Sequence, residues 1–276
     1  MNSEPVALVT GATSGIGEAT AHRLHGRGYT VFAVGRNPEA LNTLRSKGLQ
    51  ARSLDVTDQA GVDRLIEEIN AEHGGVDVLV NSAGYPLPRP LEQVELSELR
   101  QLFETNVVAT LHLSQAVLPT MRAQGYGRIV TVGSTGGRFT SPGAGAYHTV
   151  KYAIEALSLS MGAEVAPFGV RVVVIDPTGV RTPFVSSQFA TEHSYPDDDP
   201  YGDFKIRYSE TTRRLATAKG LTVSADTVAR AVVRVVKAKN PKPRYVVGAS
   251  GKASILARAL LSDRMWNRVM AAGIRG

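Results

Sequence analysis

Two side chains with complementary acid–base properties lie four residues apart, at Tyr147 and Lys151. Residues at this spacing share one face of a helix. A free phenol titrates near pKa ~10, and a neighbouring ammonium group favours the phenolate and so lowers that pKa toward neutrality. A tyrosine tuned in this way can give a proton to a carbonyl oxygen or take one from an alcohol. The pair therefore predicts proton transfer to or from a carbonyl or alcohol group.

Two more polar residues fit this chemistry. Ser134 lies in the loop before the tyrosine, where its hydroxyl could hold the substrate oxygen and stabilise charge on it. Asn106 lies in a predicted helix, and a buried amide there would need partners, for which a water molecule linked to Lys151 is one solution. Each residue alone also has a structural interpretation, but together they indicate a catalytic group. His148 points about 100° around the helix from Tyr147, and we interpret it as structural.

A glycine-rich turn separates the first predicted strand from the first helix, in the sequence Thr10-Gly11-Ala-Thr-Ser-Gly15-Ile-Gly17. Glycine allows a tight turn and a close approach of the backbone to phosphate. The N-terminus of the following helix offers free N–H groups and the positive end of its dipole. In this strand–helix context the turn predicts a dinucleotide site. Its predicted residues are Gly11, Thr13, Ser14, Gly15, Ile16 and Gly17.

The residues after the second and third strands predict which dinucleotide binds. An acidic residue after the second strand would hold the ribose 2′-hydroxyl of NAD, but this chain has Gly35-Arg36. The Arg36 guanidinium can grip a 2′-phosphate, so NADP(H) is the predicted cofactor, with a surface arginine as the alternative interpretation. Asp55, followed by Val56, could accept a hydrogen bond from the adenine amino group or cap the helix that begins near Thr57.

The order of elements places these motifs at one edge of a sheet. Apolar runs predict buried strands at 6–10, 31–34, 51–54, 76–80, 128–132, 170–175 and 244–247. Helical patterns cover 18–28, 38–47, 59–73, 97–124, 146–166 and 225–237, with Ser97 as the expected N-cap of the fourth helix. The alternation predicts an α/β fold with a doubly wound parallel sheet of the Rossmann type, in a single domain over 1–276. Asn81, Ala83 and Gly84 then form a turn beside the adenine ribose.

Two segments lie outside this alternation. The segment 181–222 is long and rich in proline and acidic residues, and we interpret it as a substrate lid that is mobile without ligand. Its aromatic residues are expected to shape the substrate pocket: Phe184, Phe189, Tyr195, Tyr201 and Phe204. The helical segment 252–272 sets apolar residues beside arginines, which suits a second subunit better than an anionic membrane surface. We therefore expect a homo-oligomer, with this segment near an interface or the pocket mouth.

Composition narrows the class of protein. The absence of cysteine excludes disulfides and thiolate metal sites, and we expect no metal. The N-terminal residues lack the pattern of a signal peptide, and no apolar run approaches the ~20 residues of a membrane span, so a soluble, cytoplasmic protein is expected. Residues 201–276 hold 16 Lys/Arg and 4 Asp/Glu, but no nucleic-acid-binding pattern accompanies this charge.

From about Val6 to Val247 the chain resembles the short-chain dehydrogenase/reductase family. The resemblance is carried by Gly11, Gly15 and Gly17, by the Asn-x-Ala-Gly turn at 81–84, and by the Tyr-x-x-x-Lys motif at 147–151. It implies that Tyr147 is the acid/base and that Lys151 lowers the pKa of Tyr147 and binds the nicotinamide ribose. It also implies that Ser134 orients the substrate, that Asn106 supports a proton relay, and that Arg36 belongs to an NADP-preferring branch.

One motif departs from the family pattern. The family usually has Pro-Gly after the sixth strand, whereas this chain has Pro177-Thr178-Gly179-Val180, which leaves open the backbone path beside the nicotinamide. Thr182 matches the threonine expected near the carboxamide. The residues after Arg244 resemble, more loosely, the hydroxysteroid and retinol dehydrogenase branch, which implies a hydrophobic ketone or secondary alcohol.

The sequence thus predicts an NADP(H)-dependent oxidoreductase that interconverts a ketone or aldehyde and an alcohol, acting on a hydrophobic small molecule. Two alternatives use the same motifs. A sensor would bind NADP(H) without catalysis, and a related isomerase, dehydratase or epimerase would use the same site for another reaction. The presence of the Tyr–Lys pair beside the glycine turn disfavours the sensor, because a sensor has no need of the catalytic residues.

Overall fold

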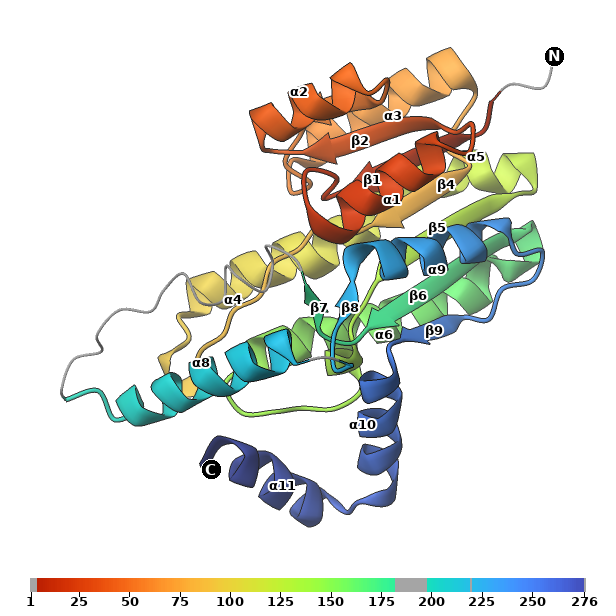
Figure 1. Cartoon of the computed structure of the whole chain (residues 1–276). Helices are drawn as coiled ribbons and strands as arrows, with labels where there is room; N and C mark the ends of the chain where they lie inside the picture. The colour runs from red at the N-terminus through yellow and green to blue at the C-terminus, as the bar shows by residue number, and fades with distance from the viewer. Residues whose placement is uncertain (1–3, 182–197, 219, 276) are drawn as a thin grey trace.

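The molecule is built on a parallel sheet of seven strands in the order β3-β2-β1-β4-β5-β6-β9 (Figure 1). The structure is a computed structural model that describes residues 4–181, 198–218 and 220–275. The strands are β1 (Val6–Thr10), β2 (Thr30–Gly35), β3 (Gln50–Ser53), β4 (Val78–Asn81), β5 (Gly127–Val132), β6 (Val170–Pro177) and β9 (Arg244–Val247). The strand order reverses beside β1, so a crevice for a ligand forms at the carboxyl ends of the strands.

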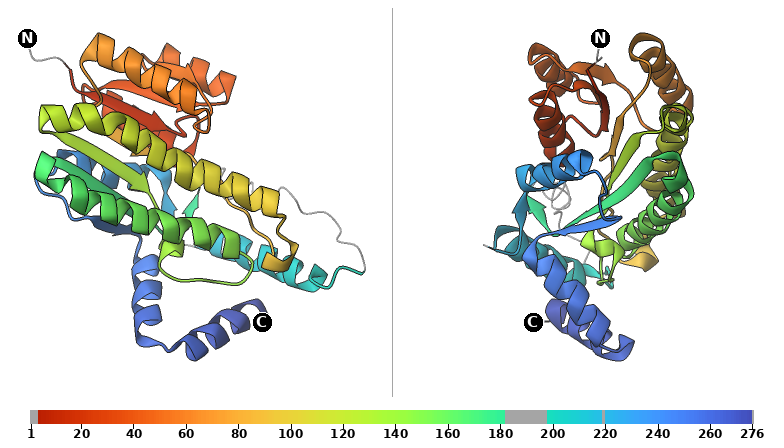
Figure 2. Two further views of the ribbon diagram at one scale, coloured as in Figure 1. Left: turned by 180° about the vertical axis from the view of Figure 1, so that it is seen from behind. Right: turned by 90° about the vertical axis from the view of Figure 1, so that its right-hand side faces the viewer.

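Helices cover both faces of the sheet, which explains why its strands read as continuous apolar runs (Figure 2). Alternate residues of β1 serve the two cores: Ala7 and Val9 pack toward one face, Val6 and Leu8 toward the other. The first face carries α1 (Gly15–His25), α2 (Pro38–Ser46) and α9 (Ala225–Lys237); the second carries α3 (Gln59–His73), α5 (Ala109–Gln124) and α6 (Gly145–Val165). The predicted doubly wound fold is confirmed.

The predicted fourth helix differs from the observed one in two respects. Instead of one regular helix over 97–124, α4 (Leu96–Phe103) continues through a π-helical turn (Glu104–Val108) into α5. The predicted N-cap at Ser97 is wrong, because the helix starts one residue earlier and Glu95 is the N-cap. The Glu98 carboxylate, one turn into the helix, accepts the Glu95 N–H at 3.2 Å. This hydrogen bond satisfies the backbone N–H of the N-cap residue.

The C-terminal part of the chain lies below the carboxyl edge of the sheet. Helix α8 (Gly202–Thr217) runs beneath α4 and α6, and a hairpin of α10 (Ala249–Leu260) and α11 (Asp263–Arg275) projects from the end of β9 (Figures 1 and 2). Helix α11 turns back and contacts α8. A small parallel pair, β7 (Val180–Arg181) with β8 (Val223–Ser224), joins the two regions. In the described part of the chain, no helix has both the length and the apolar character needed to cross a membrane.

Candidate active site

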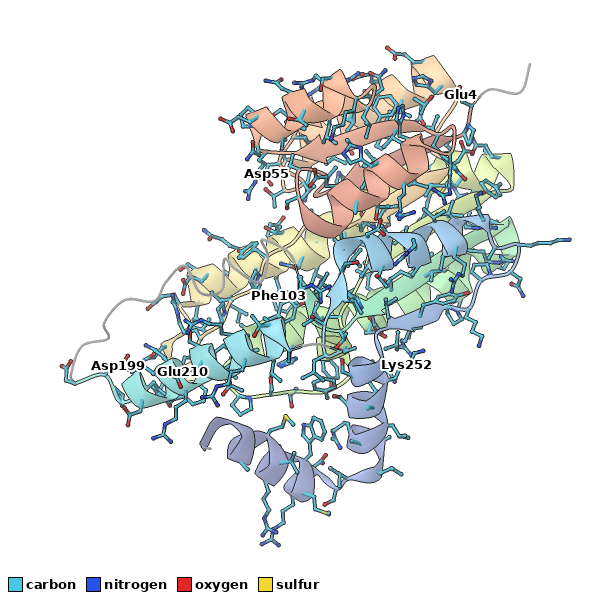
Figure 3. All side chains as sticks on the ribbon, viewed as in Figure 1. Glu4, Asp55, Phe103, Asp199, Glu210 and Lys252 are labelled. Atoms are coloured by element: carbon cyan, nitrogen blue, oxygen red, sulfur yellow. The ribbon has the colours of Figure 1, made fainter. Side chains whose placement is uncertain are left out.

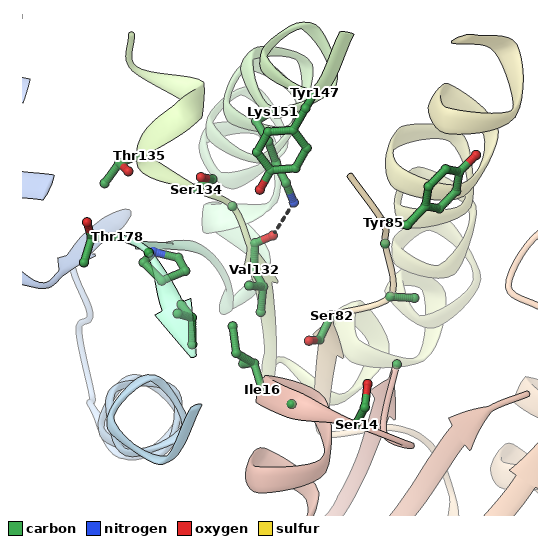
Figure 4. A pocket seen from close by; sticks show the side chains of 18 of the residues that line it. Ser14, Ile16, Ser82, Tyr85, Val132, Ser134, Thr135, Tyr147, Lys151 and Thr178 are labelled. Atoms are coloured by element: carbon green, nitrogen blue, oxygen red, sulfur yellow. Dashed lines mark hydrogen bonds between the residues drawn. The ribbon is translucent and has the colours of Figure 1, made fainter. Parts of the chain in front are cut away.

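A cavity of about 630 Å³ opens where the carboxyl ends of the strands meet α8 and α10 (Figure 4). Its walls come from the loops after the first six strands of the sheet in chain order, so the predicted motifs converge although they are far apart in the sequence. The predicted site residues that line it are Gly11, Thr13, Ser14, Gly15, Ile16, Arg36, Asp55, Val56, Ala83, Gly84, Ser134, Tyr147, Lys151, Pro177, Thr178, Gly179 and Val180.

Three further predicted site residues, Gly17, Asn81 and Asn106, do not line this cavity. Gly17 lies behind the glycine turn, where a Cβ atom would come within 2.3 Å of the Gly11 carbonyl oxygen. Asn81 is buried, and its amide donates to the Ser114 hydroxyl at 3.3 Å, so it holds the turn after β4 against α5. Asn106 lies behind Gly84, and Thr182 falls outside the described residues.

The glycine turn after β1 is held against the turn after β4. Gly11 and Gly15 have positive φ angles of 64° and 57°, a backbone conformation that favours glycine. A Cβ atom on Gly11 would lie 2.8 Å from the Ser82 carbonyl oxygen. The Thr10 hydroxyl accepts the N–H groups of Ser82 and Ala83 at 3.1 and 3.2 Å. Only glycine permits this close approach of the two turns.

The N-terminus of α1 opens from the same turn. Its N-cap, Ser14, makes no side-chain hydrogen bond to the helix, so the first N–H groups of α1 are left for another acceptor. A backbone cradle with free N–H groups at a helix N-terminus fits the pyrophosphate of a dinucleotide. The residues present therefore fit the cofactor that the sequence predicts.

Arg36 and Asp55 face each other at the end of the cavity next to the carboxyl ends of β2 and β3. Figure 3 labels Asp55 at this edge of the sheet. The Arg36 guanidinium lies 3.1 Å from the Asp55 carboxylate and is 77% exposed. Asp55 also accepts the N–H and hydroxyl of Thr57 at 3.0 and 2.8 Å. Burial raises the pKa of Asp55, but the hydrogen bonds from Thr57 and Arg36 outweigh it and leave this pKa below its usual value.

Asp55 is not the helix cap that one interpretation of the sequence gave. The helix begins at Gln59, and the Asp58 carboxylate caps it by accepting the Gly61 N–H at 3.0 Å. Asp55 instead stabilises the short turn before that helix through Thr57. Its side chain lines the cavity beside Arg36.

Tyr147 and Ser134 meet at the centre of the cavity. Tyr147 lies in the first turn of α6, and Ser134 precedes a short 3-10 helix, η3 (Thr135–Gly137), where its hydroxyl accepts the Gly136 N–H at 3.0 Å. The Tyr147 and Ser134 side chains both line the cavity, and the Ser134 hydroxyl is near enough to act on the Tyr147 phenol. Figure 4 shows both hydroxyl groups on the same side of α6, directed into the cavity. Two hydroxyls in this arrangement can hold one substrate oxygen between them.

Lys151 lies one turn along α6 from Tyr147. Its ammonium group donates to the Val132 carbonyl at 3.0 Å and lies 5.6 Å from the centre of the Tyr147 ring (Figure 4). Burial lowers the pKa of Lys151 to about 8, against the opposing effect of Asp176. Burial raises the pKa of Tyr147 to about 12, partly offset by the neighbouring Ser134 hydroxyl. The predicted shift of this pKa toward neutrality is therefore wrong, because burial of the phenol disfavours the phenolate.

Asn106 lies in the π-helical turn between α4 and α5 and is 2% exposed. Its amide nitrogen donates to the Leu102 carbonyl at 3.0 Å, whereas its side-chain oxygen has no donor among the described residues. A Cβ atom on Gly84 would lie 2.5 Å from that oxygen, so glycine at position 84 makes room for it. The π turn thus presents a buried acceptor at the wall of the cavity, which is a common use of such turns.

His148 organises the loop that carries the serine, as the sequence interpretation expected. The Ser141 N–H donates to its Nε2 atom at 3.0 Å, so Nδ1 carries the proton and donates to the Gly136 carbonyl at 2.7 Å. Burial lowers the pKa of His148, which agrees with a neutral ring. Its hydrogen-bond partners are the Gly136 carbonyl and the N–H and hydroxyl of Ser141, all in the 136–141 loop, so its role is structural.

Thr178 is the residue that separates Pro177 from Gly179, where the family usually has Pro-Gly. Its hydroxyl lies 3.0 Å from that of Ser250, and its N–H donates to the Val247 carbonyl at 2.9 Å. A Cβ atom on Gly248 would lie 2.2 Å from the Thr178 methyl group. The Thr178 side chain is therefore accommodated by the absence of a side chain at Gly248, at the start of α10. The backbone after Gly179 continues directly into β7.

The remaining wall of the cavity carries apolar and hydroxyl groups and was largely missed by sequence reasoning. It is formed by Tyr85, Thr105, Thr135, Phe139, Thr212, Leu215, Ala216, Leu221, Thr222, Ser250 and Ser254. Of these, Ser250 and Ser254 had a usable signal, because small hydroxyl residues at i and i+4 mark one face of a helix. Two of the aromatic residues predicted for this role, Tyr201 and Phe204, do not line the cavity. Tyr201 bonds to Glu92 and Phe204 packs on Tyr208, while Phe184, Phe189 and Tyr195 fall outside the described residues.

Helix α11 supports this wall from outside through Trp266. The indole ring is 4% exposed, packs edge-on against Phe139 with ring centres 5.4 Å apart, and donates its N–H to the Thr140 carbonyl at 3.0 Å. The Arg258 guanidinium lies over its other side, 5.9 Å from the ring centre. Helix α11 therefore fixes the position of an aromatic residue that lines the cavity.

These features define a Rossmann-type dinucleotide-binding protein with a Ser–Tyr–Lys group at the cofactor crevice. The family model described as "short chain dehydrogenase" matches residues 5–193. A curated relative, the NADPH-dependent 3-dehydrocapnine reductase of Ornithobacterium rhinotracheale, is 31% identical over 95% of each chain. A short-chain dehydrogenase from Streptomyces avermitilis has a similar structure, with a TM-score of 0.81 and 33% identity over 94% of this chain and 93% of that one.

A further solved structure, a variant of the actinorhodin polyketide ketoreductase with NADPH, has a TM-score of 0.75 and 30% identity over 90% of this chain and 96% of that one. The chain belongs to the short-chain dehydrogenase/reductase family, and it is an oxidoreductase. Proteins of this family bind nicotinamide cofactors and act on small molecules.

Proposed function

We propose that this protein uses NADP(H) to interconvert an uncharged, largely apolar ketone or aldehyde and the corresponding alcohol. The observation that carries the proposal is the pair of hydroxyl groups of Tyr147 and Ser134, which open into the same cavity as the glycine cradle. When bound, the nicotinamide supplies or accepts the hydride. The relatives named for NADPH and for ketone reduction support the cofactor and the reaction type.

The protein's own residues would provide proton transfer and orientation. The Ser134 hydroxyl holds the substrate oxygen, and Tyr147 donates its proton to that oxygen in reduction or takes it back in oxidation. Lys151 places a positive charge beside the phenol, which favours the phenolate, and it binds the nicotinamide ribose. The unsatisfied oxygen of Asn106 is the acceptor that a proton relay toward Lys151 requires.

Binding of the cofactor would use the remaining predicted residues. The cradle formed by Gly11, Gly15 and the N-terminus of α1 holds the pyrophosphate, and Gly17 keeps that helix close to the strand. Arg36 turns from Asp55 to the 2′-phosphate, and Asp55 accepts from the adenine amino group. Residues 177–180, and Thr182 after them, bound the nicotinamide end of the cavity.

The cavity wall supports an apolar, uncharged substrate. Beyond the cofactor cradle its described side chains are aromatic, aliphatic or hydroxyl-bearing, and Lys151 is the charged group nearest the reacting centre. A carboxylate or phosphate on the substrate would lose its hydration there without gaining a partner. The hydroxyls of Thr212, Ser250 and Ser254 can bind a second oxygen of the substrate, away from the reacting carbonyl.

A panel of ketones and aldehydes with NADPH tests the proposal. We expect loss of nicotinamide absorbance with apolar ketones, and at least tenfold lower kcat/KM for the same ketone carrying a terminal carboxylate, since ~1.4 kcal/mol of uncompensated desolvation gives tenfold. The Tyr147→Phe chain is the blank. Tight binding of NADPH without oxidation by any member of the panel would favour a sensor instead.

Trp266 provides a second test, located at the substrate end. Trp266→Ala removes the ring that supports Phe139, so we expect a KM for apolar ketones raised by about tenfold and an unchanged Kd for NADPH. Asn267→Ala, at an exposed position of the same helix, is the matched control and should alter neither constant. An unchanged ketone KM in a folded Trp266→Ala chain would contradict the role given to α11.

The outer side of the α10–α11 hairpin is also where we place contacts in a homo-oligomer. Leu256 and Leu260 on α10 and Met265 and Val269 on α11 are at least half exposed, and each pair is spaced four residues apart. Apolar stripes of this kind are usually covered in the functional assembly. The basic charge of residues 201–276 suits the acidic remainder of a second copy.

A further inference from the structure

Two carboxyl groups face each other beneath the loop that carries Ser134. Asp176, on β6, is 0% exposed, and Glu155, on α6, is 6% exposed. The two side chains are within hydrogen-bonding contact. No donor among the described residues reaches either oxygen of Asp176 or the Oε1 atom of Glu155. Two ionised carboxylates cannot donate to each other, and like charges this deeply buried repel strongly.

The neighbouring cations can balance only one of these charges at close range. Arg244, on β9, donates to Oε2 of Glu155 from its Nε atom at 2.7 Å, and the same Nε atom lies 3.6 Å from Oδ2 of Asp176. Arg138, in the loop after η3, also acts on Asp176 but is partly exposed and therefore screened by solvent. The Lys151 ammonium interacts with Asp176 without a hydrogen bond, since it donates to the Val132 carbonyl. Burial and the neighbouring Glu155 raise the pKa of Asp176 to about 8.

Asp176 lies where its charge affects the proposed catalytic residues. The Gly133 N–H donates to the carbonyl of Ile175 at 2.8 Å, and a Cβ atom on Gly133 would lie 2.4 Å from Oδ1 of Asp176. The carboxyl group therefore packs against the residue that precedes Ser134. Ionised Asp176 raises the pKa of both Tyr147 and Lys151.

We propose that Asp176 and Glu155 share one proton at neutral pH, and that the uncharged Asp176 is a positioning residue for the proton transfer by Tyr147. The shared proton gives Asp176 an O–H that donates to Glu155 and leaves a single negative charge for Arg244. It also keeps a second negative charge away from Tyr147, where it would make the phenol a poorer proton donor. The positioning role rests on the proposed function, whereas the shared proton does not.

Infrared spectroscopy tests the shared proton without any turnover. Infrared spectra of wild type and Asp176→Asn are recorded at pH 7, with ¹³C-labelled aspartate in both proteins. Their difference spectrum should contain the carbonyl band of a protonated carboxylic acid. The band should fade as the pH rises through about 8. Asp63→Asn, a half-exposed aspartate on α3 that pairs with His112, is the control and should show no such band. Absence of the band from the Asp176 difference at pH 7 overturns the proposal.

Kinetics at pH 7 test the positioning role. Glu155→Gln leaves Asp176 as the only carboxyl group beside Arg244, so we expect Asp176 to ionise and the acid band to disappear. The kcat should then fall about tenfold, because a rise of one unit in the pKa of Tyr147 corresponds to a tenfold change in equilibrium. Asp176→Ala removes the donor to Glu155 and lowers kcat similarly. Asp176→Asn, uncharged and of the same shape, should restore kcat to within about threefold of wild type, with the Kd for NADPH unchanged in all three variants. If folded Asp176→Asn is as slow as Asp176→Ala, a negative charge at Asp176 is required and the proposal is wrong.

Discussion

Replacing Tyr147 with phenylalanine is expected to reduce kcat by at least about 100-fold, because positioned acid–base catalysis contributes roughly 10²–10⁴-fold. The ring of Tyr147 packs beside Ala146 and Val150 in a small core cluster, and phenylalanine keeps that packing. The substitution removes the hydroxyl beside Ser134 and leaves the glycine cradle intact. The Kd for NADPH, measured by quenching or titration calorimetry, should therefore stay within about twofold.

Tyr152→Phe is the matched control, since this tyrosine lies in the same helix with 43% of its surface exposed and should tolerate the loss of its hydroxyl. Lys151→Ala should differ from both, lowering kcat and weakening NADPH binding together, because the ammonium acts on the phenol and on the ribose. Its positive charge is present below the pKa of about 8 and lost above it, so wild-type kcat should decline as the pH rises through that value. Turnover by Tyr147→Phe close to the wild-type rate would refute the assigned chemistry.

Arg36→Leu is expected to raise the KM for NADPH by about 10- to 100-fold, because the substitution removes a charge-assisted hydrogen bond worth roughly 1.5–3 kcal/mol. The KM for NADH should change by less than about threefold, because NADH has no 2′-phosphate. In the structure Arg36 is held by Asp55 at an exposed site, so it can exchange that partner for a phosphate without leaving a buried charge unpaired.

Arg64→Leu serves as the control for charge alone, because this exposed arginine on α3 lies 3.9 Å from the Asp58 carboxylate and does not line the cavity. It should leave both cofactor constants unchanged. The informative quantity is the ratio of kcat/KM for NADPH to that for NADH in each variant. An equal effect of Arg36→Leu on the two cofactors would mean that Arg36 does not contact the 2′-phosphate.

The parts of the fold and site that follow local rules could be predicted from the sequence. Buried parallel strands read as apolar runs, and the bounds of α3, α9 and β9 agree with the predicted ranges. The glycine turn at Gly11–Gly17 was recognisable because its backbone requirements fall on consecutive residues. Tyr147 and Lys151 were recognisable because four residues set a fixed angle on a helix.

The parts that depend on distant contacts could not be predicted. Periodicity placed Trp266 on an apolar stripe with Met265 and Val269, but only the approach of α11 to Phe139 decides that the indole is buried and the other two exposed. The pKa of Tyr147 was misjudged because burial of the phenol depends on the whole cavity and not on the spacing to Lys151.

The π-helical turn at Glu104–Val108 has a consequence for which insertions and deletions the chain can tolerate. The turn holds an extra residue within an otherwise α-helical path, and α5 after it buries Leu113, Val117 and Met121 against the sheet. Deleting one residue there would restore a regular helix but rotate everything after it by about 100°. The apolar stripe of α5 and the inward amide of Asn106 could then no longer both face the protein. Variation in chain length should therefore be absent from 104–108 in homologous sequences and be confined to the surface loops.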